Sequence, residues 1–250
     1  MNQVPEILKK TKIVCTIGPS SESPEILEQL IENGMNVARL NFSHGSHEEH
    51  LEKIKNIRKI RRKLNQPIAI MLDTKGPEIR TGNFNVDEIF LKPGDVFTLT
   101  TRDVEGTEDI VSVSYEGLPD DVEIGSYIYI DDGLVQLEVT EIKDGTDVIC
   151  KAINNGVLSD HKGVNLPGRQ TNLPSITPKD IDDIKFGIEN DIDLIAASFV
   201  RKKEDVYDIR RVLEDNGGEH IKIFSKIESQ EGVDLSLIHI SEPTRLRRIS

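Results

Sequence analysis

The sequence has few cysteines, no excess of positive charge and no long apolar run, and each absence excludes a class of protein. The two cysteines, Cys15 and Cys150, have no CxxC spacing, so they predict free thiols in a reducing compartment rather than a disulfide or a zinc site. A formal net charge of −13 lacks the basic surface that a general nucleic-acid or membrane-surface binder needs. No segment approaches membrane-spanning length, and residues 1–12 lack the apolar stretch of a signal peptide. We therefore expect a cytoplasmic enzyme or binding protein.

The composition is that of an ordinary folded protein. Hydrophobic residues make up 36% and charged residues 30% of 250 residues, which allows one large domain or two smaller ones with a substantial core. The basic run over residues 53–63 carries Ile54, Ile57 and Ile60 at helical spacing, so it predicts an amphipathic helix with a solvated basic face. Neither GxxxxGK[ST] nor GxGxxG occurs, and a P-loop or Rossmann enzyme is therefore unsupported.

Residues 11–74 alternate apolar strands with helices. The segments TKIVCTIG, NVARLNF and IAIMLDT predict three strands. Ser23 and Pro24 predict the start of a first helix, and Ser46 with Glu49 predicts a capping box for a second. Near-continuous apolar strands separated by helices are typical of a parallel sheet covered by helices.

Between about Gly76 and Gln170 the helical signals vanish. Short alternating runs such as VFTLT, YIYI and LVQLEV are separated by turn pairs, among them Asp132-Gly133, Asp144-Gly145 and Asn155-Gly156. This pattern predicts a separate all-β module.

After the module the β/α pattern resumes. Thr177 to Asp180 predicts a helix start, DLIAASFV and IKIFSKIE predict a fourth and a fifth strand, and a helix is expected between them, up to about Asp215. The fold class we predict is α/β, a partial (β/α)₈ TIM barrel with an all-β lid domain inserted after the third strand. Residues 1–75 and 171–234 would form the barrel part, and residues 76–170 the lid.

Polar side chains fall where three of the predicted strands end. They are Arg39, Asn41 and Ser43 at alternate positions, and so on one face, of the second strand, Asp73 at the end of the third, and Lys226 and Glu228, which also share one face, on the fifth. Any one of them could be a polar strand end that faces water. Three strands that deliver polar residues to one rim favour a site, because chemistry in such barrels occurs at the carboxyl ends of the strands.

These residue types suit a phosphorylated, metal-bound substrate. Arg39 and Lys226 supply positive charge, and the carboxylates of Asp73 and Glu228 are hard oxygen ligands for Mg²⁺ or a monovalent cation. The neutral side-chain oxygens of Asn41 and Ser43 suit a weakly charged ion such as K⁺. Cations and hard metals without an obvious nucleophile are typical of phosphoryl transfer, where positioning and charge neutralisation provide most of the catalysis.

Three further residues stay open at this point. His44 is equally consistent with a nucleotide contact and with packing against its loop. We expect His47, in the first helical turn, to face solvent. Lys162, in HKGVNLPG, is as consistent with a surface lysine as with a phosphate contact.

Several long motifs resemble the pyruvate kinase family over nearly all of residues 10–234: MNVARLNFSHG, MLDTKGPEIRTG, HKGVNLPG, DIKFGIENDIDLIAASFVRKKEDV and KIESQEGVD. The resemblance implies transfer of a phosphoryl group from phosphoenolpyruvate to ADP, with Mg²⁺ and usually K⁺. It implies a homotetramer for the complete enzyme only, and a lid function for the β-module.

The resemblance also implies a role for each matching residue. Arg39 would bind the substrate phosphoryl group, Lys226 would stabilise it during transfer, and Glu78 goes with K⁺ dependence. The implied ligand sets are Asn41, Ser43, Asp73 and Thr74 for K⁺, Glu228 for Mg²⁺, and Asn41, His44, Arg80 and Lys162 for the nucleotide.

The sequence departs from the family pattern after Asp234. Leu235 to Arg245 look like a translated sequencing-library adaptor, so we interpret residues 235–250 as a non-native tail. Without the later strands and a second Mg²⁺ carboxylate, we expect the 250-residue chain itself to be inactive. Two alternatives are a Mg²⁺-dependent aldolase and, for this chain, non-catalytic binding by an isolated β-module.

Overall fold

The computed structural model describes residues 10–169 and 171–235, which fall into two compact units. Unit 1 contains the described residues up to Gly76 together with residues 176–227, and unit 2 contains residues 77–175 together with residues 228–235. Within these described ranges, no helix is both long enough and apolar enough to cross a membrane. Residues 236–250, most of the segment interpreted as a non-native tail, lie outside the described part of the chain.

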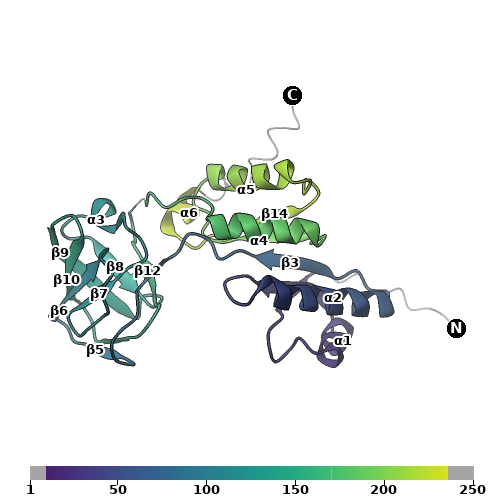
Figure 1. Ribbon diagram of the computed structural model, residues 1–250, viewed down its shortest axis with the longest axis horizontal. Coiled ribbons are helices and arrows are strands. Elements are labelled where there is room, and N and C mark those ends of the chain that lie inside the picture. The colour runs from purple at the N-terminus through teal and green to yellow at the C-terminus, as the bar shows by residue number, and fades with distance from the viewer. Residues whose placement is uncertain (1–9, 170, 236–250) are drawn as a thin grey trace. The chain divides into compact units, whose positions relative to one another are not determined.

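Unit 1 alternates strands and helices along the chain, as the sequence predicts (Figure 1). Its elements are β1 (Ile13–Thr16), α1 (Pro24–Glu32), β2 (Met35–Asn41), α2 (His47–Lys63), β3 (Ala69–Asp73), α4 (Pro178–Glu189), β13 (Leu194–Ala197), α5 (Lys203–Asp215) and β14 (Lys222–Ser225). The strands form a five-stranded sheet in the order β1-β2-β3-β13-β14, and every neighbouring pair is parallel. A parallel sheet with a helix in each connection, and with its strands in the order in which they occur along the chain, suits part of a (β/α) barrel.

The helix starts of unit 1 are fixed by the predicted caps. The Ser23 hydroxyl accepts a hydrogen bond from the Ile26 N–H, and Pro24 occupies the first helical turn. Ser46 with Glu49 forms the predicted capping box of α2, so this prediction is confirmed. The helices and strands then bury an apolar core that includes Leu27, Leu40, Phe42, Ile54, Ile57, Ile70, Leu72, Ile184, Ile195 and Leu213.

Asp180, in the first turn of α4, binds Gly76 and Thr177. These two residues lie where the chain leaves unit 1 for residues 77–175 and where it returns. Its Oδ1 accepts a hydrogen bond from the Gly76 N–H at 3.0 Å, and its Oδ2 accepts from the N–H and hydroxyl of Thr177 at 3.1 and 2.6 Å. The Asp180 residue is 1% exposed. Gly76 has a φ of +73°, and a Cβ there would lie 2.8 Å from the Ser198 Cβ, so glycine is required.

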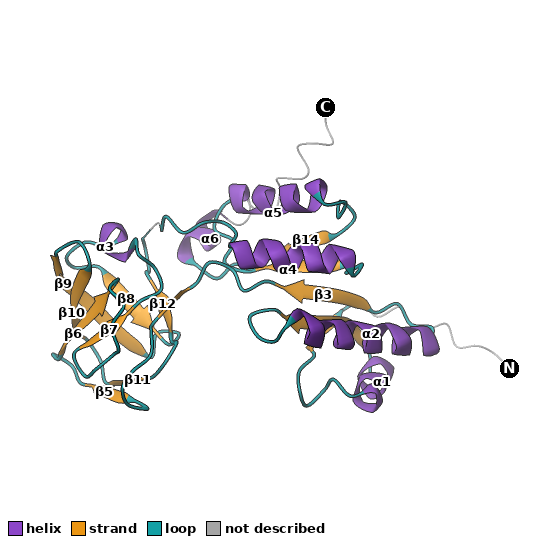
Figure 2. Cartoon of the chain, viewed as in Figure 1, coloured by secondary structure: helices purple, strands orange, loops and turns teal. Residues whose placement is uncertain are grey.

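Unit 2 is built almost entirely of strands and loops (Figure 2). Its elements are β4 (Ile79–Arg80), β5 (Ile89–Leu91), β6 (Val96–Thr100), β7 (Ile110–Ser112), α3 (Leu118–Asp121), β8 (Tyr127–Ile130), β9 (Val135–Lys143), β10 (Asp147–Ala152), β11 (Gly156–Leu158), β12 (Gly163–Asn165) and α6 (Gln230–Leu235). The four-residue helix α3 is the one departure from the all-β pattern expected between residues 76 and 170.

The strands of unit 2 form a seven-stranded sheet in the order β4-β12-β8-β9-β10-β6-β7 and a two-stranded sheet of β11 and β5. Its pairs are antiparallel except β6 with β7. One continuous core lies beneath them and includes Phe97, Leu99, Ile128, Leu137 and Val148, none of which is exposed.

Two of the predicted turn pairs have the left-handed backbone that such turns require. Asp132 and Gly133 have φ of +54° and +89°, and Asp144 and Gly145 have +53° and +66°. The predicted turn at Asn155-Gly156 is wrong, because Gly156 begins β11. Glycine is needed there for close packing, since a Cβ would lie 2.4 Å from a methyl group of Val135.

Both cysteines are free thiols, as predicted. Cys15 is half-buried in β1 of unit 1, and Cys150 is buried in β10 of unit 2. Burial raises the pKa of the Cys150 thiol to about 12, so this group stays protonated and unreactive near neutral pH.

Candidate functional site

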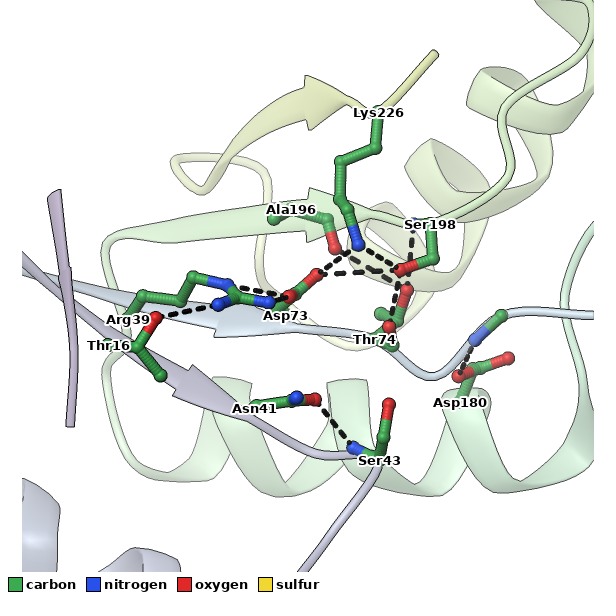
Figure 3. Close-up of polar contacts among 11 residues, drawn as sticks. Thr16, Arg39, Asn41, Ser43, Asp73, Thr74, Asp180, Ala196, Ser198 and Lys226 are labelled. Atoms are coloured by element: carbon green, nitrogen blue, oxygen red, sulfur yellow. Dashed lines mark hydrogen bonds and ion pairs between the residues drawn. The ribbon is translucent and has the colours of Figure 1, made fainter. Parts of the chain in front are cut away.

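Asp73, the last residue of β3, binds two cationic side chains at the carboxyl edge of the parallel sheet (Figure 3). The Arg39 Nε donates to Asp73 Oδ2 at 2.7 Å, and the Arg39 Nη2 donates to the same oxygen. The Lys226 Nζ lies 3.2 Å from Asp73 Oδ1. The Asp73 side chain is 1% exposed, whereas those of Arg39 and Lys226 are 30% and 32% exposed. A buried carboxylate therefore orients two partly exposed cations toward one region.

Strand register explains why Arg39 and Asp73 meet. Arg39 is two residues from the end of β2, and β2 pairs in parallel with β3 so that Asn41 lies opposite Asp73. On the other side, Arg39 Nη1 donates to the Thr16 hydroxyl at 2.6 Å, at the end of β1. Thr16 is absent from the predicted site, although it too is a polar residue where an apolar strand ends.

Asn41 lies opposite Asp73 on the neighbouring strand, and Ser43 follows it in the next turn, so the two are not two positions of one strand. Strand β2 ends at Asn41, and Ser43 is in the following turn, so the prediction that they share a strand face is wrong. The Asn41 Oδ1 accepts a hydrogen bond from the Ser43 N–H at 3.0 Å, and this side-chain-to-backbone bond stabilises the turn. The turn keeps both side chains near the sheet edge (Figure 3).

Ser198 joins the same network and was not among the predicted site residues. It directly follows β13, is 5% exposed, and its Oγ lies 2.9 Å from Lys226 Nζ and 2.5 Å from the Thr74 carbonyl oxygen. The sequence signal existed, because Ser198 stands at the end of the apolar strand segment DLIAASFV as Asp73 stands at the end of IAIMLDT.

Glu228 differs from the other predicted rim residues. Strand β14 ends at Ser225, so the alternation that would put Lys226 and Glu228 on one strand face does not apply. Glu228 is exposed, and it groups with unit 2 whereas Lys226 groups with unit 1. Within residues 10–169 and 171–235, no three His, Cys, Asp or Glu side chains come together as metal ligands.

Arg80 and Lys162 are neighbours in unit 2, Arg80 on β4 and Lys162 directly before β12, the strand that pairs with β4. Arg80, in β4, donates two hydrogen bonds to the Glu78 carboxylate at 2.7 and 2.9 Å and a third to the His161 carbonyl oxygen at 2.6 Å. The hydrogen bonds that Arg80 donates to the Glu78 carboxylate raise the pKa of Arg80 above its ordinary value. Lys162, just before β12, pairs with Asp131 at 2.9 Å. Each cation thus already has a carboxylate partner, with which an incoming anion would compete.

The histidines of the second β/α connection have different surroundings. His44 is exposed in the turn, and its carbonyl oxygen lies 2.9 Å from His50 Nε2, which must therefore carry the proton. The side chain of His47 is 32% exposed, so it faces solvent only in part. Its Nε2 lies 2.7 Å from Asp183 Oδ1 and its ring stacks on Phe186, both on α4, a helix far away in the sequence. His50 is buried, and this burial lowers its pKa.

Comparison with known proteins assigns the family. The profile described as "Pyruvate kinase, barrel domain" matches residues 8–242. The chain is 58%, 55% and 54% identical over 228 residues to proteins named pyruvate kinase from Staphylococcus epidermidis, Staphylococcus saprophyticus and Staphylococcus aureus. Each alignment covers 91% of this chain and 39% of the relative, so the chain spans about two fifths of the length of these curated relatives.

Proposed function

The chain belongs to the pyruvate kinase family, and on that premise we propose that its parent protein transfers the phosphoryl group of phosphoenolpyruvate to ADP. The bond between phosphorus and the enol oxygen breaks, a bond to the terminal ADP oxygen forms, and the enolate takes up a proton to give pyruvate beside ATP. The observation that carries this proposal is the pairing of Arg39 and Lys226 on the buried Asp73 carboxylate. Family membership favours phosphoryl transfer over the aldolase alternative.

The charges of this group suit a phosphoryl ligand. Two cations lie on one buried carboxylate, and a phosphoryl group carries the negative charge that both cations attract. In our proposal Arg39 binds the phosphoryl oxygens with its planar guanidinium, and Lys226 stabilises the charge on the group during transfer. Because Asp73 and Thr16 already hold Arg39, little reorganisation is needed when the substrate binds.

The oxygen atoms next to these cations suit a monovalent metal ion. We propose that K⁺ is held by the side chains of Asn41, Ser43 and Asp73 and by Thr74, which lie at the ends of the neighbouring strands β2 and β3. All are oxygen donors, and the charge of Asp73 is already balanced by two cations, which favours a singly charged ion over a divalent one. When bound, K⁺ would supply additional positive charge next to the phosphoryl group.

For Mg²⁺ we propose Glu228 as a carboxylate ligand. Glu228 alone does not make a Mg²⁺ site, and the described part of the chain gathers no cluster of acidic ligands around it. Phosphate oxygens of the substrates are ligands that Mg²⁺ commonly takes in kinases, and they would complete its coordination.

Unit 2 is proposed to be the lid of the enzyme, inserted between the barrel segments 1–75 and 171–234. We propose that Arg80 and Lys162 contact the nucleotide together with Asn41 and His44. The support is that Arg80 on β4 and Lys162 directly before the adjacent strand β12 each have a carboxylate partner that a nucleotide phosphate could displace. A lid that excludes water strengthens the electrostatic interactions of the transferring group.

For the 250-residue chain itself we propose that the activity is absent. Strands β1 and β14 each pair on one side only within the described residues, so the sheet ends in two open edges. A non-catalytic role for the β-module remains the alternative for this chain. Residues 235–250 are proposed to be non-native, and a homotetramer and a cytoplasmic location are proposed for the complete protein only.

The test is an assay of pyruvate formation from phosphoenolpyruvate and ADP. The full-length parent protein is expected to be active, with Lys226→Met reducing kcat by at least about a hundredfold because a charge-stabilising group is lost. Lys185, exposed on α4, provides the matched control Lys185→Met, which should keep full activity. Absence of activity in the parent, or full activity of Lys226→Met, would contradict the proposal; activity of the purified 250-residue chain would contradict its inactivity.

A further inference from the structure

Ser198 and Lys226 stand opposite each other where two neighbouring parallel strands end. Ser198 follows β13, Lys226 follows β14, and the main chain continues to pair beyond both strands. The Lys226 N–H donates to the Ala197 carbonyl oxygen at 2.9 Å, and the Val200 N–H donates to the Lys226 carbonyl oxygen at 3.1 Å. The backbone of Lys226 is therefore bonded to residues on both sides of the Ser198-Phe199 pair.

Phe199 has an unusual backbone conformation that shapes this pair. Its φ is +54°, in the left-handed region that residues with a Cβ rarely adopt. Such strain persists only where the surroundings hold it, and it is concentrated at functional sites. At Phe199 this conformation lets the main chain turn between the Ala197 carbonyl oxygen and the Val200 N–H, which both form hydrogen bonds with the Lys226 backbone. The Ser198 hydroxyl then meets the Lys226 ammonium group at 2.9 Å (Figure 3).

The direction of this hydrogen bond follows from the other contacts of Ser198. Its hydroxyl donates to the Thr74 carbonyl oxygen at 2.5 Å, while the Asp73 Oδ1 is more distant at 3.4 Å. Since a hydroxyl group has a single hydrogen, its lone pairs are left to accept from Lys226 Nζ. The Ser198 N–H also donates to the Thr74 Oγ1 at 3.1 Å, which fixes the backbone independently of the hydroxyl.

We propose that Ser198 is a positioning residue for Lys226, and this inference rests on the phosphoryl-transfer function proposed above. Asp73 attracts the ammonium group but, as an anion, also reduces the positive charge that Lys226 presents. Ser198 is a neutral acceptor, so it restricts the direction of the ammonium group without cancelling its charge. Thr74 holds the hydroxyl in place, and Lys226 is thereby oriented toward the transferring phosphoryl group before the substrate binds.

The contact can be tested without any enzymatic activity. The full 250-residue chain and its Ser198→Ala variant are treated with acetic anhydride, and the acylation rate of each lysine is measured by mass spectrometry. Lys226 is expected to react about threefold to tenfold faster in Ser198→Ala, because a hydrogen bond to a charged group is lost. Lys185, exposed on α4, is the internal reference, and Ser225→Ala at the end of β14 is the matched control.

A variant that fails to fold is recognised by its circular dichroism spectrum. If Ser198→Ala does not fold, Ser198→Cys is used in its place, because the thiol fills similar space and is only a weak hydrogen-bond acceptor. Acceleration at Lys226 alone supports the contact. An unchanged rate at Lys226 in a folded variant, or the same acceleration at Lys185, would overturn it.

The positioning role is tested in the full-length parent protein. Ser198→Ala is expected to lower kcat about tenfold while KM for phosphoenolpyruvate changes less than about twofold, as for an interaction that acts in the transition state. A merely structural serine would lower the melting temperature and leave kcat per folded molecule unchanged, which would overturn the inference. If the wild-type parent shows no pyruvate kinase activity, the proposed function fails while the labelling result still tests the contact.

Discussion

The two units differ in how their sheets end: a bridge between Thr81 and Val113 joins the chain next to the outer strands β4 and β7 of unit 2, whereas β1 and β14 of unit 1 each pair on one side only within the described residues. In unit 2 one continuous core runs beneath both sheets, and the strand residues Val148 and Cys150 have no exposed surface. Both units expose single apolar side chains, such as Ile124 (70%) in unit 2, but in unit 1 they also lie on the open outer strands, with Val14 of β1 49% exposed and Phe224 of β14 53% exposed. Unpaired strand edges with exposed apolar residues are typical sites of association.

The proposed phosphoryl-transfer residues and the more complete sheet therefore lie in different units. The charged group around Asp73 lies in unit 1, whose sheet is open at β1 and β14 within the described residues. Arg80 and Lys162, for which we propose nucleotide contacts, lie in unit 2, on β4 and directly before β12. We infer that unit 2 is the self-sufficient part of this chain, and that unit 1 depends on further chain or on association to cover its edges.

The largest effect is expected from separating the two units. Residues 77–175, expressed alone, should fold as a monomer with β-sheet circular dichroism and one cooperative thermal transition, because their core is contained within this range. Unit 1, made by joining residues 10–76 to 176–227 through a short linker, should associate or aggregate through its open edges. Size-exclusion chromatography with light scattering measures both outcomes. A monomeric, cooperatively folded unit 1, or an unfolded residue 77–175 fragment, would contradict the comparison.

The second effect compares two phenylalanines. Phe97 in unit 2 has no exposed surface, so Phe97→Ala should reduce the free energy of unfolding of that unit by about 3–5 kcal/mol through the cavity that it leaves. Phe224, 53% exposed on β14, has little packing to lose, and Phe224→Ala should change the free energy of unfolding by less than about 1 kcal/mol. Urea unfolding of the full chain measures both. If both variants lost the same free energy of unfolding, the Phe224 side chain would have to be packed against other residues in solution, which would contradict the comparison.

The third effect is a pH dependence confined to unit 1. Burial holds the pKa of His50 below its ordinary value of 6.5, so the folded state favours the neutral ring. The stabilisation is therefore complete above pH 6.5 and is lost as the pH falls from there toward the folded pKa. The His44 carbonyl, Asp183 and Glu49 oppose the shift, and Lys53 adds to it.

His50→Gln removes this titration and should flatten the fall in melting temperature of unit 1 between pH 7 and pH 5. The matched control is His220→Gln, since His220 is exposed and its replacement should leave the pH dependence unchanged. An identical pH profile for His50→Gln and the wild type would show that His50 does not titrate as inferred.

The smallest effect is expected on the surface of unit 2. Arg102 donates two hydrogen bonds to Asp147, at 2.9 and 2.7 Å, and they lower the pKa of this carboxyl group. The ion pair therefore stabilises unit 2 above pH 3.8, the ordinary pKa of an aspartate, and this contribution is lost as the pH falls through the lower folded value. Asp147→Asn should lower the melting temperature of unit 2 slightly at pH 6 and have less effect near pH 3. Asp144→Asn, in an exposed turn, should have no effect at either pH.

Local signals in the sequence predicted the elements of unit 1 well. Apolar strand segments and caps such as Ser46-Glu49 depend on neighbouring residues, and the structure has them where the sequence indicates. The turn at Gly156 was misjudged because a glycine that permits close packing looks the same in sequence as a glycine that permits a turn.

The site residues that lie at the ends of apolar strands could be predicted from the sequence. Arg39, Asp73 and Lys226 are polar residues at the ends of apolar strands, and the structure brings them together. The partners that depend on the folded chain were not predictable. His47 and Asp183, for example, are 136 residues apart in the sequence, and no local pattern relates them. Ser198 obeys the strand-end rule, but its role depends on the Phe199 backbone turn, which the sequence does not signal.

The Asp180 carboxylate has a consequence for how this architecture can change. Gly76 and Thr177 are bound to the same side chain, so the two ends of the intervening segment are held together by unit 1 itself. We infer that a domain inserted here need not disturb the pairing of β3 with β13, because Asp180 holds the two ends of the insertion next to each other. We therefore expect that a short turn, or an unrelated domain with adjacent termini, can replace residues 77–175 while the path of the chain through the parallel sheet stays the same.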